Sequence, residues 1–213
     1  MLPEWLRSGL LLETLREARR LGFLGPGPVE DHVRHSVGFL GAAGEQSEPQ
    51  LVVDLGSGGG VPGLILALAW PTCRVVLLDA SERKAAFLLQ AAGQLGLIAP
   101  RVEVVRERAE HVGRQDRWRA VADLVVARAF GSPAAVAECA APLLRTGGRL
   151  IVSEPPEGGS GRWPEAGLVS LGLVAATCSE RHEGGWYRVL TQQERCPDRF
   201  PRRTGVPAKR PLF

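Results

Sequence analysis

The sequence predicts a doubly wound α/β fold, in which helices cover both faces of a mostly parallel sheet. Residues 51–53 (Leu-Val-Val) and 124–126 (Leu-Val-Val) are continuous apolar runs, typical of strands buried on both faces. Such runs alternate with longer segments of helical periodicity, and Gly, Pro, Ser or Asp residues mark the changes between them. We therefore expect one sheet of seven strands, preceded by a helical cap.

Two helices are expected before the sheet. Residues 4–21 space their leucines by three and four, as on one helix face, and residues 29–42 repeat the pattern with Val33 and Val37. A turn rich in Gly and Pro, residues 22–28, separates them. We predict a helical cap over 1–48, the main domain over 49–193, and a basic tail over 194–213 packed on or near that domain.

The alternation then continues to residue 192. The expected strands are 51–54, 74–79, 101–105, 122–127, 148–153, 172–178 and 186–192, and the expected helices are 62–70, 82–95 and 133–144. In open α/β sheets ligands bind beyond the carboxyl ends of the strands. Functional residues are therefore expected at those ends.

The end of the first strand carries the most informative segment. Asp54 closes the strand, and glycines at 56, 58, 59 and 60 lead to a helix that begins near Pro62. Glycine permits positive φ and close approach of a ligand. The free N–H groups and positive dipole end of the helix suit an anionic ligand group. This corner predicts a nucleotide-type cofactor.

Two patterns compete for the identity of that cofactor. A dinucleotide fingerprint, G-x-G-x-x-G, fits residues 58–63 but begins four positions beyond Asp54. The register D-x-G-x-G-x-G, which starts at Asp54 itself, resembles the first motif of S-adenosylmethionine (SAM)-dependent methyltransferases. Asp79 ends the second strand and is placed to accept hydrogen bonds from both ribose hydroxyls. Because NAD proteins share such a carboxylate, an NAD oxidoreductase is the weaker alternative.

Composition narrows the class of protein. The chain has 213 residues, 45% of them hydrophobic and 23% charged, as in a soluble single-domain protein. It contains neither an apolar run of about 20 residues, which a membrane span requires, nor a signal-peptide pattern at its start. The cysteines at 73, 139, 178 and 196 are scattered, so we expect reduced thiols, no metal and a cytoplasmic location. We also expect a monomer.

The net charge of +3 is unevenly distributed. The last twenty residues hold six basic and two acidic side chains and carry +4, so the rest of the chain carries about −1. This tail predicts a polyanionic partner, with a solvated tail of no specific role as the alternative.

Five motifs along the chain match the pattern of one family. Residues 53–63 match V-D-x-G-S/T-G-x-G-x-P-G, and residues 77–88 are similar to L-L-D-S-x-x-K-K/R-x-x-F-L. Residues 108–110 match R-A-E, and residues 128–129 match the end of S-R-A. Residues 200–212 are similar to Y-P-R-R-x-G-x-P-x-K-x-P-L. Together they resemble the RsmG family (also called GidB), which methylates N7 of a guanine in small-subunit (16S) ribosomal RNA. The resemblance implies a Rossmann-like methyltransferase fold and SAM as cofactor.

The sequence departs from the family pattern at two places. His35 replaces the aspartate of H-x-x-D-S, which begins here at His32. Glu154 stands where the family has a lysine after the fifth strand. The second change inverts the local charge, which bears on the RNA substrate more than on the cofactor.

The resemblance implies a role for each matching residue. The expected cofactor-binding residues are Asp54, Gly56, Ser57, Gly58, Gly60, Pro62, Asp79, Ala80, Arg108, Ala109, Glu110 and Arg128. The expected catalytic residues are Arg128 and His32, and the expected RNA-binding residues are Arg83, Lys84, Arg202, Arg203, Lys209 and Arg210.

The sequence thus predicts a SAM-dependent guanine-N7 methyltransferase whose partner is small-subunit ribosomal RNA or the small subunit itself. N7 carries a free lone pair, so the reaction requires orientation and desolvation and no general base. Two alternatives remain: a SAM-dependent methyltransferase with another substrate, and a SAM-fold protein that binds RNA or a ribosomal partner without catalysis.

Overall fold

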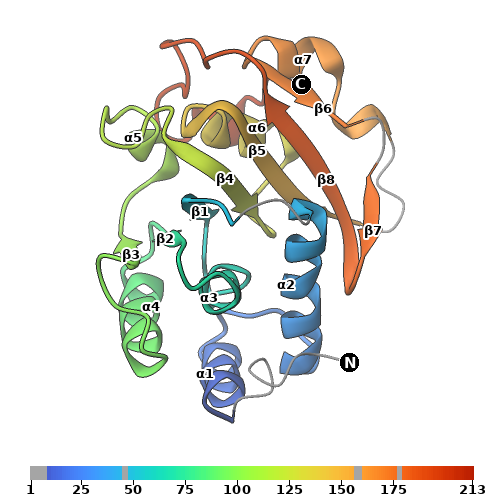
Figure 1. The fold of residues 1–213 in the computed structure, drawn as a ribbon. Helices are drawn as coiled ribbons and strands as arrows, with labels where there is room; N and C mark the ends of the chain where they lie inside the picture. The colour runs from blue at the N-terminus through green and yellow to red at the C-terminus, as the bar shows by residue number, and fades with distance from the viewer. Residues whose placement is uncertain (1–8, 45–47, 156–159, 177–178) are drawn as a thin grey trace.

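The computed structural model describes residues 9–44, 48–155, 160–176 and 179–213. A twisted sheet lies at the centre and helices flank it on both faces (Figure 1). The strands are β1 Leu51–Leu55, β2 Arg74–Leu78, β3 Val102–Val105, β4 Ala122–Ala127, β5 Leu144–Glu154, β6 Leu173–Ala175, β7 Glu180–His182 and β8 Gly185–Gln192. The helices are α1 Gly9–Arg20, α2 Val29–Ala43, α3 Gly63–Ala69, α4 Glu82–Gln94, α5 Ala109–Val112, α6 Pro133–Ala140, α7 Glu165–Val169 and α8 Val206–Lys209.

The order of strands is that of a doubly wound sheet. It runs β3-β2-β1-β4-β5-β8-β6, with β7 paired to β8 outside this path. The first five strands are parallel, whereas β8 lies antiparallel to both β5 and β6. The strand order therefore progresses from β1 toward β3 on one side and from β1 toward β5 on the other, and leaves a crevice beyond the end of β1 where ligands bind in such folds.

Each face of the sheet packs against its own set of helices. On one face, α2, α3 and α4 cover side chains such as Val52 and Leu77, and α1 packs outside them. On the other face, α5, α6 and α7 cover Val53 and Val125. Figure 1 shows these two groups on opposite sides of the sheet. The mostly parallel α/β architecture predicted from the apolar strands is confirmed.

Some element boundaries differ from those expected. The described part of the sheet has eight strands where seven were predicted, because the hairpin of Arg181 and Trp186 adds the three-residue strand β7. Helix α6 ends at Ala140, four residues early: Ala141 still has helical φ and ψ, but Pro142 has no N–H to continue the helical hydrogen bonds. The expected first helix begins at Gly9, and its residues 4–8 lie outside the described chain, as do residues 177–178 of the sixth expected strand and Cys178.

Helix α2 is bound closely to β8 through a glycine. Tyr187 is fully buried, and its hydroxyl donates to the carbonyl of His35. A side chain at Gly38 would collide with the Tyr187 ring and hydroxyl. The contact therefore requires glycine at position 38, and it sets the position of the helix that carries His32.

Within the described ranges, none of the helices has the length and apolar character to cross a membrane.

Candidate active site

The turn after β1 is held by the strand's own aspartate. Asp54 is buried, and its Oδ2 accepts a hydrogen bond from the N–H of Gly63 at 3.0 Å, at the start of α3. The Ser57 hydroxyl closes the turn by donating to the Asp54 carbonyl at 3.0 Å. Burial, with a smaller contribution from the nearby Asp79 charge, raises the pKa of Asp54 to about 7. Asp54 therefore stabilises the turn through its hydrogen bonds and does not line the cavity described below.

The second strand's aspartate connects this turn to β2. Asp79 Oδ2 accepts from the N–H of Gly58 at 3.0 Å, and Oδ1 accepts from the N–H of Ser81 at 2.8 Å. Gly58 adopts φ +54°, which favours glycine and directs its N–H toward the carboxylate. Lys84 Nζ lies 3.9 Å from Oδ2. Each carboxylate oxygen has two lone pairs, so Asp79 retains acceptor capacity toward a ligand.

A cavity of about 400 Å³ opens beside these residues, within the range of small-molecule sites. Seven residues predicted from the sequence line it: Gly56, Asp79, Ala80, Lys84, Arg108, Ala109 and Glu110. Its lining also includes residues that were not predicted, among them Phe130, Gly131, Ser132, Ala135, Pro207 and Ala208. Cavity-lining residues thus come from the ends of β1, β2 and β4, from α5 and α6, and from the C-terminal segment.

Glycine at position 56 keeps open the space between the turn and the cavity. It has φ +77°, and a Cβ there would lie 2.6 Å from the Phe130 ring. Any other residue at position 56 would therefore fill the space between the turn and the residues after β4. The predicted residues Ser57, Gly58, Gly60 and Pro62 shape the turn from behind and are not among those that line the cavity. Arg128, also predicted to bind the cofactor, is not among them either.

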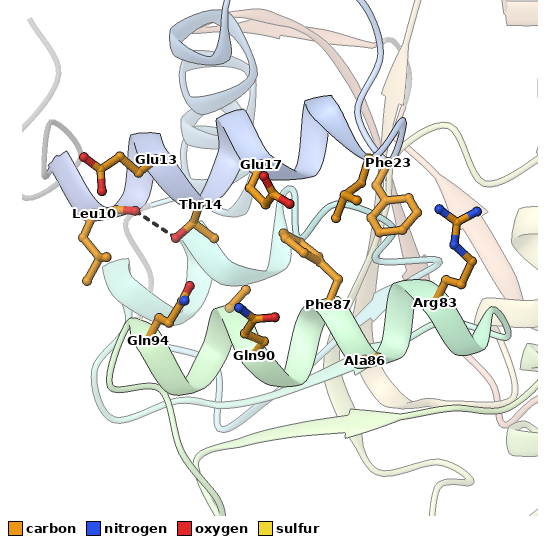
Figure 2. A pocket seen from close by; sticks show the side chains of 12 residues that line it. Leu10, Glu13, Thr14, Glu17, Phe23, Arg83, Ala86, Phe87, Gln90 and Gln94 are labelled. Atoms are coloured by element: carbon orange, nitrogen blue, oxygen red, sulfur yellow. Dashed lines mark hydrogen bonds between the residues drawn. The ribbon is translucent and has the colours of Figure 1, made fainter.

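Another cavity, of about 500 Å³, lies away from this edge of the sheet, between α1 and α4. Figure 2 shows Glu13 and Glu17 of α1 on one side and Gln90 and Gln94 of α4 on the other. It shares no residue with the glycine turn. Because the ligands of this fold bind at the strand ends, the smaller cavity is the candidate cofactor site, and it is called the cofactor cavity below.

Arg128 follows β4 and contacts the helical cap. Its Nη2 donates to Nδ1 of His32 at 2.6 Å, and Nε2 of His32 then donates to the carbonyl of Gly25 at 3.1 Å. This arrangement needs a neutral imidazole, and burial together with the Arg128 charge lowers the pKa of His32. Arg128 Nη1 is buried without a hydrogen-bond partner among the described residues. The next residue, Ala129, has φ +54°, a strained conformation of the kind that clusters at functional sites.

Comparison with known proteins decides the family. The model of GidB, rRNA small subunit methyltransferase G, matches residues 29–154. A ribosomal RNA small subunit methyltransferase G of Rubrobacter xylanophilus is 36% identical over 225 residues, covering 95% of this chain and 80% of the relative. One from Prochlorococcus marinus is 38% identical over 177 residues, covering 78% and 69%. The chain belongs to the GidB (RsmG) family.

Solved structures agree on the fold. The cofactor-bound protein Rv0187 from MTB superposes with a TM-score of 0.58 at 20% identity, covering 90% of this chain and 91% of that one. The T. thermophilus 16S rRNA methyltransferase RsmC, solved with AdoMet and guanosine, superposes with a TM-score of 0.52 at 19% identity, covering 79% of this chain and 40% of that one. At these identities the likeness shows a shared Rossmann-like methyltransferase fold.

The departure from the GidB pattern at Glu154 is compensated locally. Glu154 is buried at the end of β5, where its Oε1 accepts from the Trp163 Nε1–H at 3.2 Å. Its Oε2 forms an ion pair with Arg162 Nε at 3.2 Å. Glu154 thus stands where the family has a lysine, but the charge of Arg162 beside it offsets that of the carboxylate, so the local net charge is close to zero.

The residues expected to bind RNA in this GidB protein have different surroundings. Arg83 lies 5.7 Å from the Phe23 ring centroid and lines the α1–α4 cavity, whereas Lys84 lines the cofactor cavity. Arg202 forms a two-point ion pair with buried Glu138 through Nε and Nη2, so part of its charge is already balanced, and its contact with phosphate stays a prediction. Arg203, Lys209 and Arg210 are exposed.

Proposed function

We propose that this protein transfers a methyl group from SAM to N7 of a guanine in 16S ribosomal RNA. The observation that carries the proposal is the cavity at the end of β1, where the glycine turn, Asp79 and the segment after β4 meet in a chain of the GidB family. Gly56 would admit the methionyl part of SAM and Asp79 would hold the ribose. The backbone of Ala109 and Glu110 would contact the adenine.

SAM supplies an electrophilic methyl group on a sulfonium. The protein's own task is to orient the base and exclude water, because the N7 lone pair attacks without prior loss of a proton. Arg128 is suited to this task, since neutral His32 holds one of its nitrogens and leaves Nη1 free for an anionic or carbonyl oxygen. We assign Arg128 to the reacting groups and His32 to the positioning of Arg128.

The proposal includes the organisation of the chain. Residues 49–193 would form the methyltransferase domain, 1–48 its helical cap and 194–213 a C-terminal segment packed on it. We propose that the protein works in the cytoplasm as a monomer without a metal, on ribosomal RNA or on the small subunit.

The direct test is methyl transfer from isotope-labelled SAM to small ribosomal subunits that lack the N7 modification. Label at one guanine, located by strand cleavage at 7-methylguanine, is the expected result. Binding of SAM with no transfer to these subunits would refute the RNA substrate and favour another methyl acceptor.

The exposed cations of the C-terminal segment are the proposed phosphate contacts. Replacing Arg203, Lys209 and Arg210 by Gln should weaken RNA binding and reduce the salt dependence of its affinity, by about one unit of slope for each phosphate that is no longer neutralised. Filter binding across a salt series measures this slope. An unchanged slope would show that the cations do not meet phosphate.

A further inference from the structure

The C-terminal segment contributes to the cofactor cavity. Pro207 and Ala208, both in the short helix α8, are among the residues that line it. The match to the family model ends at residue 154, and the resemblance of residues 200–212 to the family's C-terminal motif assigns a role to neither Pro207 nor Ala208. The segment lies far from the glycine turn in sequence and reaches the cavity only through tertiary contacts.

A buried glutamate in α6 holds the start of this segment. Glu138 has no exposed surface. Its Oε2 accepts from Arg202 Nη2 at 2.6 Å, and its Oε1 accepts from Arg202 Nε and from the Arg202 backbone N–H, both at 2.8 Å. Arg202 Nη2 also donates to the Arg210 carbonyl at 2.7 Å, so one side chain connects both ends of the segment to α6.

A second carboxylate holds the middle of the segment. Glu110 Oε1 accepts from the Gly205 N–H at 2.8 Å and lies 3.4 Å from Arg108 Nη2. Burial opposes ionisation of Glu110, but the Gly205 N–H and the Arg108 charge outweigh it and lower its pKa. Arg108 and Glu110 also line the cavity, so the Glu110 carboxylate connects this part of the cavity wall to the C-terminal segment.

A guanidinium fixes the chain before it reaches these carboxylates. Arg119 Nη1 donates to the carbonyls of Gly113 and Phe200, both at 2.8 Å. Its Nη2 donates to the carbonyls of Cys196 and Pro197 at 2.9 and 3.0 Å. The segment therefore enters the cavity region with its backbone already restrained.

We propose that residues 202–210, here called the C-terminal strap, form a wall of the cofactor site, with Glu110 and Glu138 as the positioning residues that hold it. The inference rests on the proposed function. Pro207 and Ala208 lie on the same cavity as Ala109 and Ala135, and such an apolar surface suits a planar base. The strap would therefore cover the adenine, whereas Gly56 and Asp79 serve the rest of SAM.

The sharpest test enlarges a residue of the wall without disturbing the core. Ala208 is exposed, so Ala208→Phe adds a ring toward the cavity without overpacking buried residues. We expect the Kd for SAM, measured by calorimetry, to rise at least about tenfold, or about 1.4 kcal/mol. The unfolding midpoint of the SAM-free protein should stay unchanged. Thr204→Ala, an exposed change in the same strap, is the matched control and should leave the Kd for SAM unchanged.

A second pair of variants tests the anchors. Glu110→Ala removes the acceptor of the Gly205 N–H, whereas Glu110→Gln keeps an oxygen there. We expect Glu110→Ala to raise the KM for SAM with little change in kcat at saturating SAM, and Glu110→Gln to recover part of the affinity. A purely structural role would lower the unfolding midpoint without this split between KM and kcat.

The outcomes distinguish the role of the strap from the proposed function. Wild-type SAM affinity in Ala208→Phe would overturn the strap as a cofactor wall and leave the proposed function standing. Failure of the unmodified protein to bind SAM would refute the proposed function, and the role of the strap with it.

Discussion

Replacement of Asp79 separates its two roles, as the anchor of the glycine turn and as the proposed ribose ligand. In Asp79→Ala the N–H groups of Gly58 and Ser81 lose their acceptor. Each buried donor left without a partner costs about 1–3 kcal/mol of stability. SAM would lose up to two hydrogen bonds to a charged acceptor, each worth about 1.5–3 kcal/mol. The expected loss of SAM affinity is therefore about 100-fold or more, at 1.4 kcal/mol per factor of ten.

The milder change, Asp79→Asn, gives the cleaner measurement. Asparagine keeps one oxygen acceptor but turns an amide donor toward one of the two backbone N–H groups. The protein should fold, bind SAM about 10–100-fold more weakly and show reduced methyl transfer, because hydrogen bonds to a neutral acceptor are weaker than those to a charged one. Calorimetry gives the affinity, and urea unfolding gives the stability.

Asp123→Asn is the matched control. Asp123 also accepts a backbone N–H, that of Leu51 at 2.8 Å, but it does so at the start of β1, at the opposite edge of the sheet. It should lose stability while keeping SAM affinity. If Asp79→Asn behaved in the same way, with stability lowered and affinity unchanged, Asp79 would be an anchor of the turn only and the ribose assignment would be wrong.

Three further predictions follow from the buried charges. Because burial raises the pKa of Asp54 from 3.8 to about 7, the folded protein binds more protons than the unfolded chain in this window, and its stability falls as pH rises through it. Asp54→Asn should remove that part of the pH dependence in urea unfolding, and an unchanged dependence would contradict the shift. Arg128→Lys replaces the planar fork, whose separate nitrogens can reach His32 and a second acceptor, by a single nitrogen that carries all its donors. We therefore expect kcat to fall about 10–100-fold with SAM affinity nearly kept; unchanged kcat would exclude Arg128 from the reacting groups. Glu154→Lys places a cation against Arg162 and should cost about 3–5 kcal/mol in urea unfolding; a stable variant would show that the pair is dispensable.

The sequence predicts the centre of the fold well, for a physical reason. The strands β1 and β4 are buried on both faces, so their continuous apolar runs indicate central strands of a sheet. The glycine turn and its two aspartates are recognisable from the local sequence alone. The hairpin strand β7 is too short to show a period, and α5 and α8 have only four residues each. Such elements exist because the rest of the structure supports them, and local sequence carries little sign of them.

The candidate site shows the same limit. The position of Asp79 follows from local sequence and strand order, but the approach of Pro207 to the cavity depends on ion pairs between distant residues. Arg202 and Glu138 are 64 positions apart. The basic tail and the family motif predict a phosphate contact for Arg202, and nothing in the local sequence indicates this ion pair. A signal was present for Phe130, since it follows a strand whose carboxyl end faces the crevice. Residues that serve through tertiary contacts need the structure.

The glycine at position 38 implies a restriction on how this protein can change over time. A methyl group there would push α2 away from Tyr187, and α2 carries the imidazole that orients Arg128. A change in a packing contact would thus reach the reacting groups with no substitution among them. A smaller residue at position 187 alone would not make room for that methyl group, because the methyl group would also collide with the backbone carbonyl oxygen of Glu183. A side chain at position 38 should therefore lower both stability and activity.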